Sequence, residues 1–360
     1  MKSLAFLRIR RPKSGAGFIE SQRPTQPLAT PVSTPMPLAG YRSYQGLPQL
    51  AGLCTVEEAA KPGLSVEECV RRLKRFHYAF KRLHQILTAR ITAEPIYELK
   101  TGFAHHAYLC AEHVTALRNR IAEMREPPLG LEEVPHPALE AFFDEILAAP
   151  TTEELVWGVY QMAVHYLITD IEFYQRETNP LTDAPSRRML KFALLELNEM
   201  KDFGLKAIGT FRAPSTGSDW LNVLEALIEE AAGVAGVWPG SDNGTPRMYS
   251  KTPYQYDPIP RRDERFSDPW NQGVNAESFL YSDKYPARAK ALMMLFKRLR
   301  EIDVPEMMAA IITQTSGKPW GYYRDMSRQL WDEARHAMMG EVGFVALGVD
   351  WTKAKITHNW

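Results

Sequence analysis

Apolar residues recur with a helical period along most of this chain, and that pattern predicts an all-α fold. Ser65 and Thr151 stand where N-terminal capping residues are expected, and Pro127 and Pro180 stand where helices should stop. No segment shows the strict alternation of apolar and polar residues that predicts a strand. The expected helices cover about residues 65–87, 93–126, 152–176, 186–209, 219–234, 286–315 and 320–347.

The order of these segments predicts two helical halves joined by one long connection. The first fifty residues are rich in Pro, Ser, Thr and Gly and have almost no apolar period, so we expect a loose arm there. The rest of the chain, 51–360, is expected to form a single helical domain with extra N-terminal helices. Its parts are a first helical half (65–236), an irregular crossover (237–283), a second helical hairpin (284–347) and a C-terminal tail (348–360).

Composition narrows the range of partners. The 43 Lys and Arg residues balance 43 Asp and Glu residues, and zero net charge argues against nucleic acid as the main partner. No apolar run approaches the roughly 18 residues of a membrane span, so we expect no membrane partner. Cys54, Cys69 and Cys110 are scattered and odd in number, which excludes a disulfide scaffold or a zinc ribbon. This cysteine usage suits the cytoplasm.

The strongest chemical signal lies in the last predicted helix. Glu333 and His336 are three residues apart, so they are neighbours on one helix face. Glu333 falls between Leu330 and Ala337 on the apolar face, where a carboxylate is costly unless it is paired or bound to metal. Inward-pointing Glu-x-x-His is a pattern with which helical bundles hold metal ions.

The preceding helix supplies a second acidic candidate. Glu301 lies in a mostly apolar environment, and Pro305 removes a backbone hydrogen bond beside it, which predicts a bend there. Glu306 is nearly as well placed among apolar residues. The periodicity does not choose between the two acids.

A short internal sequence repeat extends the pattern to the first half. The segment from Arg187 to Glu199 aligns with the segment from Arg324 to His336 at one constant offset, with Arg, Met, a basic residue and Glu in common. Glu196 then corresponds to Glu333, and Glu199 to His336. We expect both first-half acids to lie on a buried face.

The first-half partner of Glu301 stays open between two helices. Glu98, His105 and Glu112 follow one another at seven-residue steps and share one side of the second helix, whereas the third helix offers His165 with Glu172. We favour Glu112 with His105 nearby.

The sequences RLREIDVPE and WDEARHAMMGE together resemble the second half of ferritin-like di-iron carboxylate proteins. This resemblance implies a ferritin-like bundle in which Glu301, Glu333 and His336 bind metal. The first half departs from the family pattern because Glu199 replaces the expected histidine. The spacing of Glu98 and His105 also occurs in haem-oxygenase-like di-iron oxidases, which have another helical scaffold. The candidate ligands are therefore Glu301, Glu333, His336, Glu196, Glu199, Glu112 and His105.

These residues predict a di-metal carboxylate oxidoreductase that activates dioxygen on a small organic substrate. The expected cofactor is two iron ions, or manganese, or a mixed pair, with a single ion if the first half is degenerate. A homodimer is compatible with this prediction. We expect aromatic residues of the crossover to form the lid of a pocket, namely Tyr249, Tyr254, Tyr256 and Trp270.

A metal-free helical interaction or scaffold protein is the alternative prediction. In it, buried glutamates would pair with arginines instead of a metal ion. The arginines available for such pairs are Arg188, Arg298, Arg300 and Arg335.

Overall fold

The computed structural model describes residues 41–124, 130–211, 219–241, 244–266 and 276–353. The chain divides into two compact units, residues 1–47 and residues 48–360. The described part of the first unit holds one 3₁₀ turn, η1 (Tyr44–Gly46). Most of the predicted arm, residues 1–40, lies outside the described residues.

The second unit is built from helices, and the described residues contain no strand, which confirms the all-α prediction. Long helices are interspersed with shorter ones, and three further 3₁₀ turns occur among the described connections. The helices are α1 (Val56–Ala60), α2 (Val66–Ala93), α3 (Tyr97–Glu123), α4 (Pro137–Leu147), α5 (Thr152–Val156), α6 (His165–Glu177), α7 (Ala184–Thr210), α8 (Asp219–Glu230), α9 (Ala276–Tyr281), α10 (Ala287–Arg300), α11 (Asp303–Gln314) and α12 (Trp320–Ala346). The 3₁₀ turns are η2 (Leu50–Gly52), η4 (Glu264–Phe266) and η5 (Trp351–Lys353).

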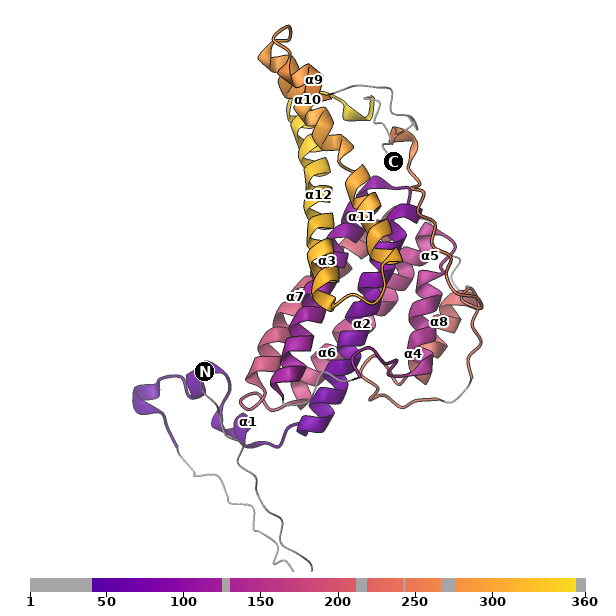
Figure 1. Ribbon diagram of the computed structural model, residues 1–360. Helices are drawn as coiled ribbons and strands as arrows, with labels where there is room; N and C mark the ends of the chain where they lie inside the picture. Colours follow the sequence, from indigo (N-terminus) through magenta and orange to yellow (C-terminus); the bar gives the residue numbers. More distant parts are fainter. Residues whose placement is uncertain (1–40, 125–129, 212–218, 242–243, 267–275, 354–360) are drawn as a thin grey trace, which may run out of the picture. The chain divides into compact units, whose positions relative to one another are not determined.

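Helix α3 lies at the centre of the packing. It runs along α2 and α12 and also contacts α7, while α11 packs on both α2 and α12 (Figure 1). Helix α10 packs on the C-terminal half of α12. A second group, α4 and α8, joins the bundle through the π-helical segment η3 (Trp157–Val164), which connects α5 to α6. The core is therefore continuous from α2 and α3 to these shorter helices.

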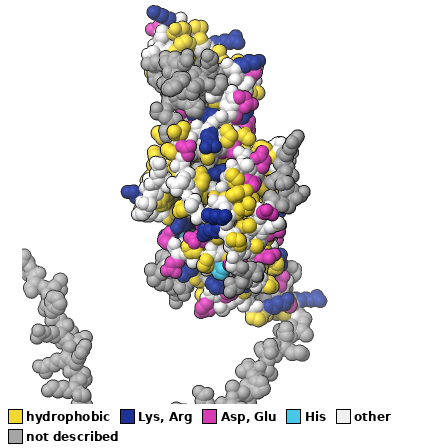
Figure 2. All heavy atoms as spheres, turned by 90° about the vertical axis from the view of Figure 1, so that its right-hand side faces the viewer, with side chains coloured by type: hydrophobic (Ala, Val, Ile, Leu, Met, Phe, Trp, Pro, Cys, Tyr) yellow, Lys and Arg dark blue, Asp and Glu magenta, His cyan; other side chains and the backbone are white. Residues whose placement is uncertain are grey.

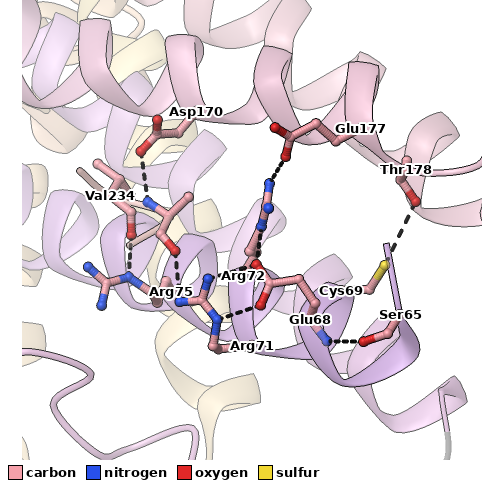
Figure 3. A network of polar contacts seen from close by, with 11 residues as sticks. Ser65, Glu68, Cys69, Arg71, Arg72, Arg75, Asp170, Glu177, Thr178 and Val234 are labelled. Atoms are coloured by element: carbon pink, nitrogen blue, oxygen red, sulfur yellow. Dashed lines mark hydrogen bonds and ion pairs between the residues drawn. The ribbon is translucent and has the colours of Figure 1, made fainter. Parts of the chain in front are cut away.

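The start of α2 is tied to distant parts of the chain by arginines. Arg75 donates from Nε to the carbonyl oxygen of Val234 at 2.6 Å, and Arg71 donates to that of Ala235 at 3.1 Å. The amide of Ala235 in turn donates to Asp170 of α6 at 2.7 Å (Figure 3). This network fixes the turn after α8 against both α2 and α6.

The helices differ from the sequence prediction at several places. The short helices α1 and α9 were not predicted, and α9 lies in the segment that was expected to be an irregular crossover. Helix α4 was not predicted, although Pro137 stands at its first turn and the ring of His136 caps it by accepting from the amide of Ala138 at 3.2 Å. The predicted helix 286–315 is broken at Glu301 into α10 and α11. Pro305 has no N–H to give to the carbonyl oxygen of Glu301, which instead accepts from Val304 at 3.1 Å. The predicted bend is thus confirmed and is sharper than expected.

The crossover is anchored at both ends of its described part. Glu145 of α4 is buried and accepts from the backbone amides of residues 248–250 at 2.7–2.9 Å. Further along, the amide of Arg261 donates to the carbonyl oxygen of Thr92 at 2.8 Å. These bonds hold residues 248–261 in place, a stretch in which the structure describes no helix or strand.

Figure 2 shows the face of the molecule that lies on the right-hand side of Figure 1. On the described part of this face, Lys and Arg side chains are separated by acidic and apolar ones, so no continuous basic surface forms there. Among the described residues, no helix is both long enough and apolar enough to cross a bilayer.

Candidate metal centre

Glu301, Glu333 and His336 converge on one another between α10 and α12. Nδ1 of His336 lies 3.0 Å from Oε2 of Glu333 and 3.2 Å from Oε2 of Glu301. One ligand atom from each of the three residues lies within 4.8 Å of the other two. Within the described ranges, no other group of three His, Cys, Asp or Glu residues converges in this way.

Close contact between two helix backbones brings these residues together. Gly340, one turn after His336, faces α10 so closely that an added Cβ would lie 2.4 Å from the backbone nitrogen of Leu299 and 2.7 Å from the carbonyl oxygen of Leu295. Only a residue without a side chain fits there. Leu299 is two residues before Glu301, so the contact at Gly340 sets the distance of Glu301 from α12.

The three side chains are partly open to solvent, with exposed fractions of 20% for Glu301, 16% for Glu333 and 32% for His336. The sequence predicted a mostly apolar environment for Glu301 and a buried position on the apolar face for Glu333. That prediction was wrong in degree, because the cluster lies at the edge of the α10–α12 contact and outside the large central core. Partial exposure leaves the cluster accessible from solution.

Two neighbouring side chains hold the carboxylates in place. Arg298 donates to Oε2 of Glu301 at 2.8 Å, and Gln329 donates to Oε1 of Glu333 at 2.5 Å. The sequence pattern indicates Arg298 only as a partner for a buried acid and does not assign a role to Gln329. Their spacings of three and four residues from the acids were the available signal, since such neighbours share a helix face.

Glu306 lies apart from the cluster and is neutralised by cations. Its side chain is completely buried and forms ion pairs with Lys100 of α3 and Arg262 of the crossover. Arg262 also pairs with Asp303. The choice between the two acids, which periodicity left open, is therefore made by tertiary packing, and Glu301 is the one that reaches Glu333.

The first-half candidates do not join the cluster. Glu196 lies against His113, with 2.6 Å between Oε2 and Nε2. His105 stacks on Trp331 of α12 with 4.4 Å between ring centroids. Burial lowers the pKa of His105, while the nearby charges of Glu196 and Glu199 act in the opposite direction. These residues are close to one another but do not form a convergent group of three.

The expectation that both α7 acids lie on a buried face was wrong. Glu199 is exposed, and the side chain of Glu196 is one-third exposed. The reason is the rotation of α7 about its axis. Leu190, Leu197 and Met200 face the core, which turns Glu199 toward solvent.

The other candidate ligands from the first half also lie outside the cluster. Glu112 is half-buried on α3 and lies outside the convergent group. On α6, Nδ1 of His165 lies 3.3 Å from Nζ of Lys201, while Glu172 is exposed. Glu98 is also occupied, because it accepts two hydrogen bonds of 2.6 Å each from Arg265.

The crossover does wall a cavity, but this cavity is separate from the cluster. Tyr254 and Tyr256 line it, and none of the three cluster residues does. Tyr249 instead donates from its hydroxyl to Glu154 at 3.1 Å. Trp270 lies outside the described residues.

Comparison with known proteins adds no further assignment. No model of a protein family matches the chain, and no curated protein and no solved structure is significantly similar to it.

Proposed function

We propose that this protein binds one iron or manganese ion through Glu301, Glu333 and His336. The convergence of one imidazole nitrogen on two carboxylate oxygens, at 3.0 and 3.2 Å, is the observation that supports the proposal. Ligand atoms around a single ion lie about 3–4 Å apart, since metal–ligand bonds are about 2 Å long. Carboxylate oxygens with one imidazole suit iron or manganese.

The ligands and their neighbouring side chains have different roles at this centre. Glu301 and Glu333 supply two negative charges that balance a divalent ion, and His336 supplies a neutral nitrogen. Gln329 fixes the second oxygen of Glu333, so that Oε2 faces His336. Arg298 compensates the charge of Glu301 until an ion takes its place.

We extend this proposal to an oxidoreductase that uses dioxygen and a small organic substrate. When bound, an ion with three protein ligands supplies redox chemistry and keeps coordination positions open. One ion is proposed in place of two because the first-half candidates lie outside the convergent group. The three free cysteines support a cytoplasmic location for this activity.

The test is metal binding by the purified full chain. We expect Mn²⁺, or Fe²⁺ under anaerobic conditions, to bind with about one ion per chain in calorimetric titration. Glu333→Gln and His336→Gln should each weaken binding by about 100-fold, because the first replaces a charged carboxylate with a neutral amide and the second removes the imidazole nitrogen. Loss of even an outer-shell partner costs about 10–100-fold. Glu199→Gln is the matched control, because it removes an exposed acid from α7, and it should bind metal as the wild type does. Absence of binding by the wild type, or equal binding by all variants, would refute the metal centre.

Reactivity is a separate measurement on the same material. We expect the Fe²⁺-loaded protein to be oxidised when dioxygen is added, with new near-ultraviolet absorption, and we expect the His336→Gln variant to lack this change. Stable Fe²⁺ binding without oxidation would retain the metal centre and remove the oxidase.

A metal-free scaffold is the second candidate, and the ion pairs of Glu306 with Lys100 and Arg262 favour it. Arg298→Gln separates the two functions. If Glu301 binds metal, removing the competing guanidinium should raise metal affinity. If the Arg298–Glu301 pair is purely structural, the variant should lose thermal stability and metal should not restore it.

A further inference from the structure

Helix α7 carries a stripe of exposed side chains on the side that faces away from the core. Its other side packs on α3, α6 and η3 through buried residues such as Leu190 and Leu197 (Figure 1). Residues three, four and seven positions from Leu195 share its side of the helix, because seven residues make about two turns. The α7 stripe defined in this way consists of exposed residues only, namely Arg188, Lys191, Phe192, Leu195, Asn198, Glu199 and Asp202.

The centre of the α7 stripe is apolar. Phe192 is 52% exposed and Leu195 is 59% exposed. The guanidinium carbon of Arg188 lies 5.0 Å from the centroid of the Phe192 ring and covers one face of it. Single exposed apolar side chains are common on protein surfaces, so these two alone do not define a partner. The charges around them carry more information.

The charged residues of the stripe are ordered symmetrically about Leu195. Lys191 and Glu199 stand four residues before and after it. Arg188 and Asp202 stand seven residues before and after it. Both cations therefore lie in the first half of the stripe and both anions in the second half. Within the part of the chain that the structure describes, none of the four forms an ion pair.

This order makes the stripe complementary to itself when one helix is turned end to end. In an antiparallel pair of α7 helices with a two-fold axis at Leu195, each residue lies opposite the one that is equally far from Leu195 on the other side. Lys191 then faces the second chain's Glu199, and Arg188 faces its Asp202. The two Leu195 side chains meet at the axis. A parallel pair in register would instead bring like charges together.

We propose that the α7 stripe is a dimerisation surface and that its occupant is the α7 stripe of a second copy of this chain, packed antiparallel. Four intermolecular ion pairs and an apolar centre would hold the two chains together. The stripe contains none of the residues of the candidate metal centre, so this inference does not rest on the proposed function.

The size of the surface sets the expected strength of the dimer. From Arg188 to Asp202 the stripe is about 21 Å long, since each residue adds about 1.5 Å to a helix. Standard interfaces bury about 800 Å² on each partner, and one helix face of this length is smaller. We therefore expect a reversible dimer with a micromolar dissociation constant.

Sedimentation equilibrium of the purified full chain tests for this dimer. We expect the mass to rise from one chain to two between about 1 μM and about 100 μM, a range that brackets a micromolar dissociation constant. Added salt should weaken the association, because ion pairs at a surface are screened. A wild-type chain that stays monomeric over the whole range would leave a different protein as the occupant of the stripe and would overturn the inference.

Two charge-reversal variants test the antiparallel arrangement. The first carries Arg188→Glu with Lys191→Glu, and its stripe is entirely acidic. The second carries Glu199→Lys with Asp202→Lys, and its stripe is entirely basic. Each variant alone should dimerise at least 100-fold more weakly, because like charges then face one another. An equimolar mixture should recover a dimer with one chain of each kind, since opposite charges again meet at all four positions.

Recovery in the mixture separates a lost interface from a folding defect, because two misfolded chains would not restore a specific dimer. Lys251→Glu with Lys318→Glu is the matched control, as it reverses two exposed charges outside α7 and should dimerise as the wild type does. Leu195→Ala removes the apolar contact at the axis and should weaken the dimer about tenfold. A dimer unaffected by the charge reversals, or a mixture that stays monomeric, would refute the proposed surface.

Discussion

At the scale of single residues, the most consequential feature is a group of opposite charges buried beneath the crossover. Lys100 is 2% exposed and Glu306 is completely buried, and Arg262 bridges Glu306 to Asp303. Two cations and two anions make the group neutral overall. Burial lowers the pKa of Lys100, and the charge of Glu306 acts against that effect. Removing one member would therefore leave a buried charge of the opposite sign without compensation.

Lys100→Met is expected to lower the free energy of unfolding by about 3 kcal/mol, because it leaves a buried excess of negative charge. The double variant Lys100→Met with Glu306→Leu removes one charge of each sign and should recover part of this loss. Urea unfolding followed by circular dichroism measures both. If the double variant loses as much unfolding free energy as Lys100→Met and Glu306→Leu lose together when each is made alone, the two residues are not coupled.

At the scale of elements, the candidate metal centre depends on how closely α10 approaches α12. The break at Glu301 ends α10 where its last turn meets α12, and Gly340 provides the space for the contact. A cluster formed by two separate helices is sensitive to small shifts of either one, because metal ligation tolerates little displacement.

Gly340→Ala tests this dependence. The added methyl group would overlap the backbone of Leu299, so α10 should move away from α12. We expect thermal stability to fall measurably and metal affinity to fall at least tenfold. Gly321→Ala is the matched control in the same helix, since an added Cβ there meets nothing within 4 Å. The control should keep its metal affinity and gain about 0.5–1 kcal/mol of stability. Equal effects of the two substitutions would contradict the close-contact explanation.

At the scale of the whole molecule, buried neutral histidines determine the response to acid. Burial lowers the pKa of His77 to about 3, of His84 to about 4 and of His106 to about 3, with nearby Arg118 adding to the effect at His77. In the unfolded chain these rings take up protons near pH 6.5. The unfolded state therefore binds more protons between pH 6.5 and pH 4, and stability falls as pH falls through this range.

Asp170 acts in the opposite direction but is a single group. Burial raises its pKa to about 6, and the hydrogen bond that the backbone amide of Ala235 donates to it partly offsets this effect. The folded state consequently takes up a proton there between pH 6 and pH 4, which offsets part of the loss from the three histidines.

We expect the free energy of unfolding to fall by about 4 kcal/mol between pH 7 and pH 5, since each unit of pKa difference corresponds to about 1.4 kcal/mol. Thermal unfolding at the two pH values measures the difference. His106→Gln removes one of the three groups and should reduce it by about 2 kcal/mol. His136→Asn, which can still cap α4, should leave it unchanged. A pH response unaltered by His106→Gln would assign the acid sensitivity to other groups.

Local sequence determined much of the fold. Helix positions follow from the apolar period together with caps such as Ser65 and stops such as Pro180, and these signals act over a few residues. The proximity of Glu333 and His336 is of the same kind, because a helix places residues three apart on one face whatever surrounds it. The sequence also predicted a bend beside Glu301, because Pro305 has no N–H to donate to the backbone hydrogen bond that a continuous helix would need there.

Tertiary structure alone decided the remaining features. Glu301 and Glu306 have equivalent sequence patterns, and only the positions of Lys100 and α12 assign one to an ion pair and the other to the cluster. The internal repeat predicted a buried face for Glu199, but the rotation of α7 about its axis exposes this residue to solvent. Sequence fixes which residues share a turn of helix, whereas the packing of side chains between helices, as at Gly340, fixes which of those turns meet.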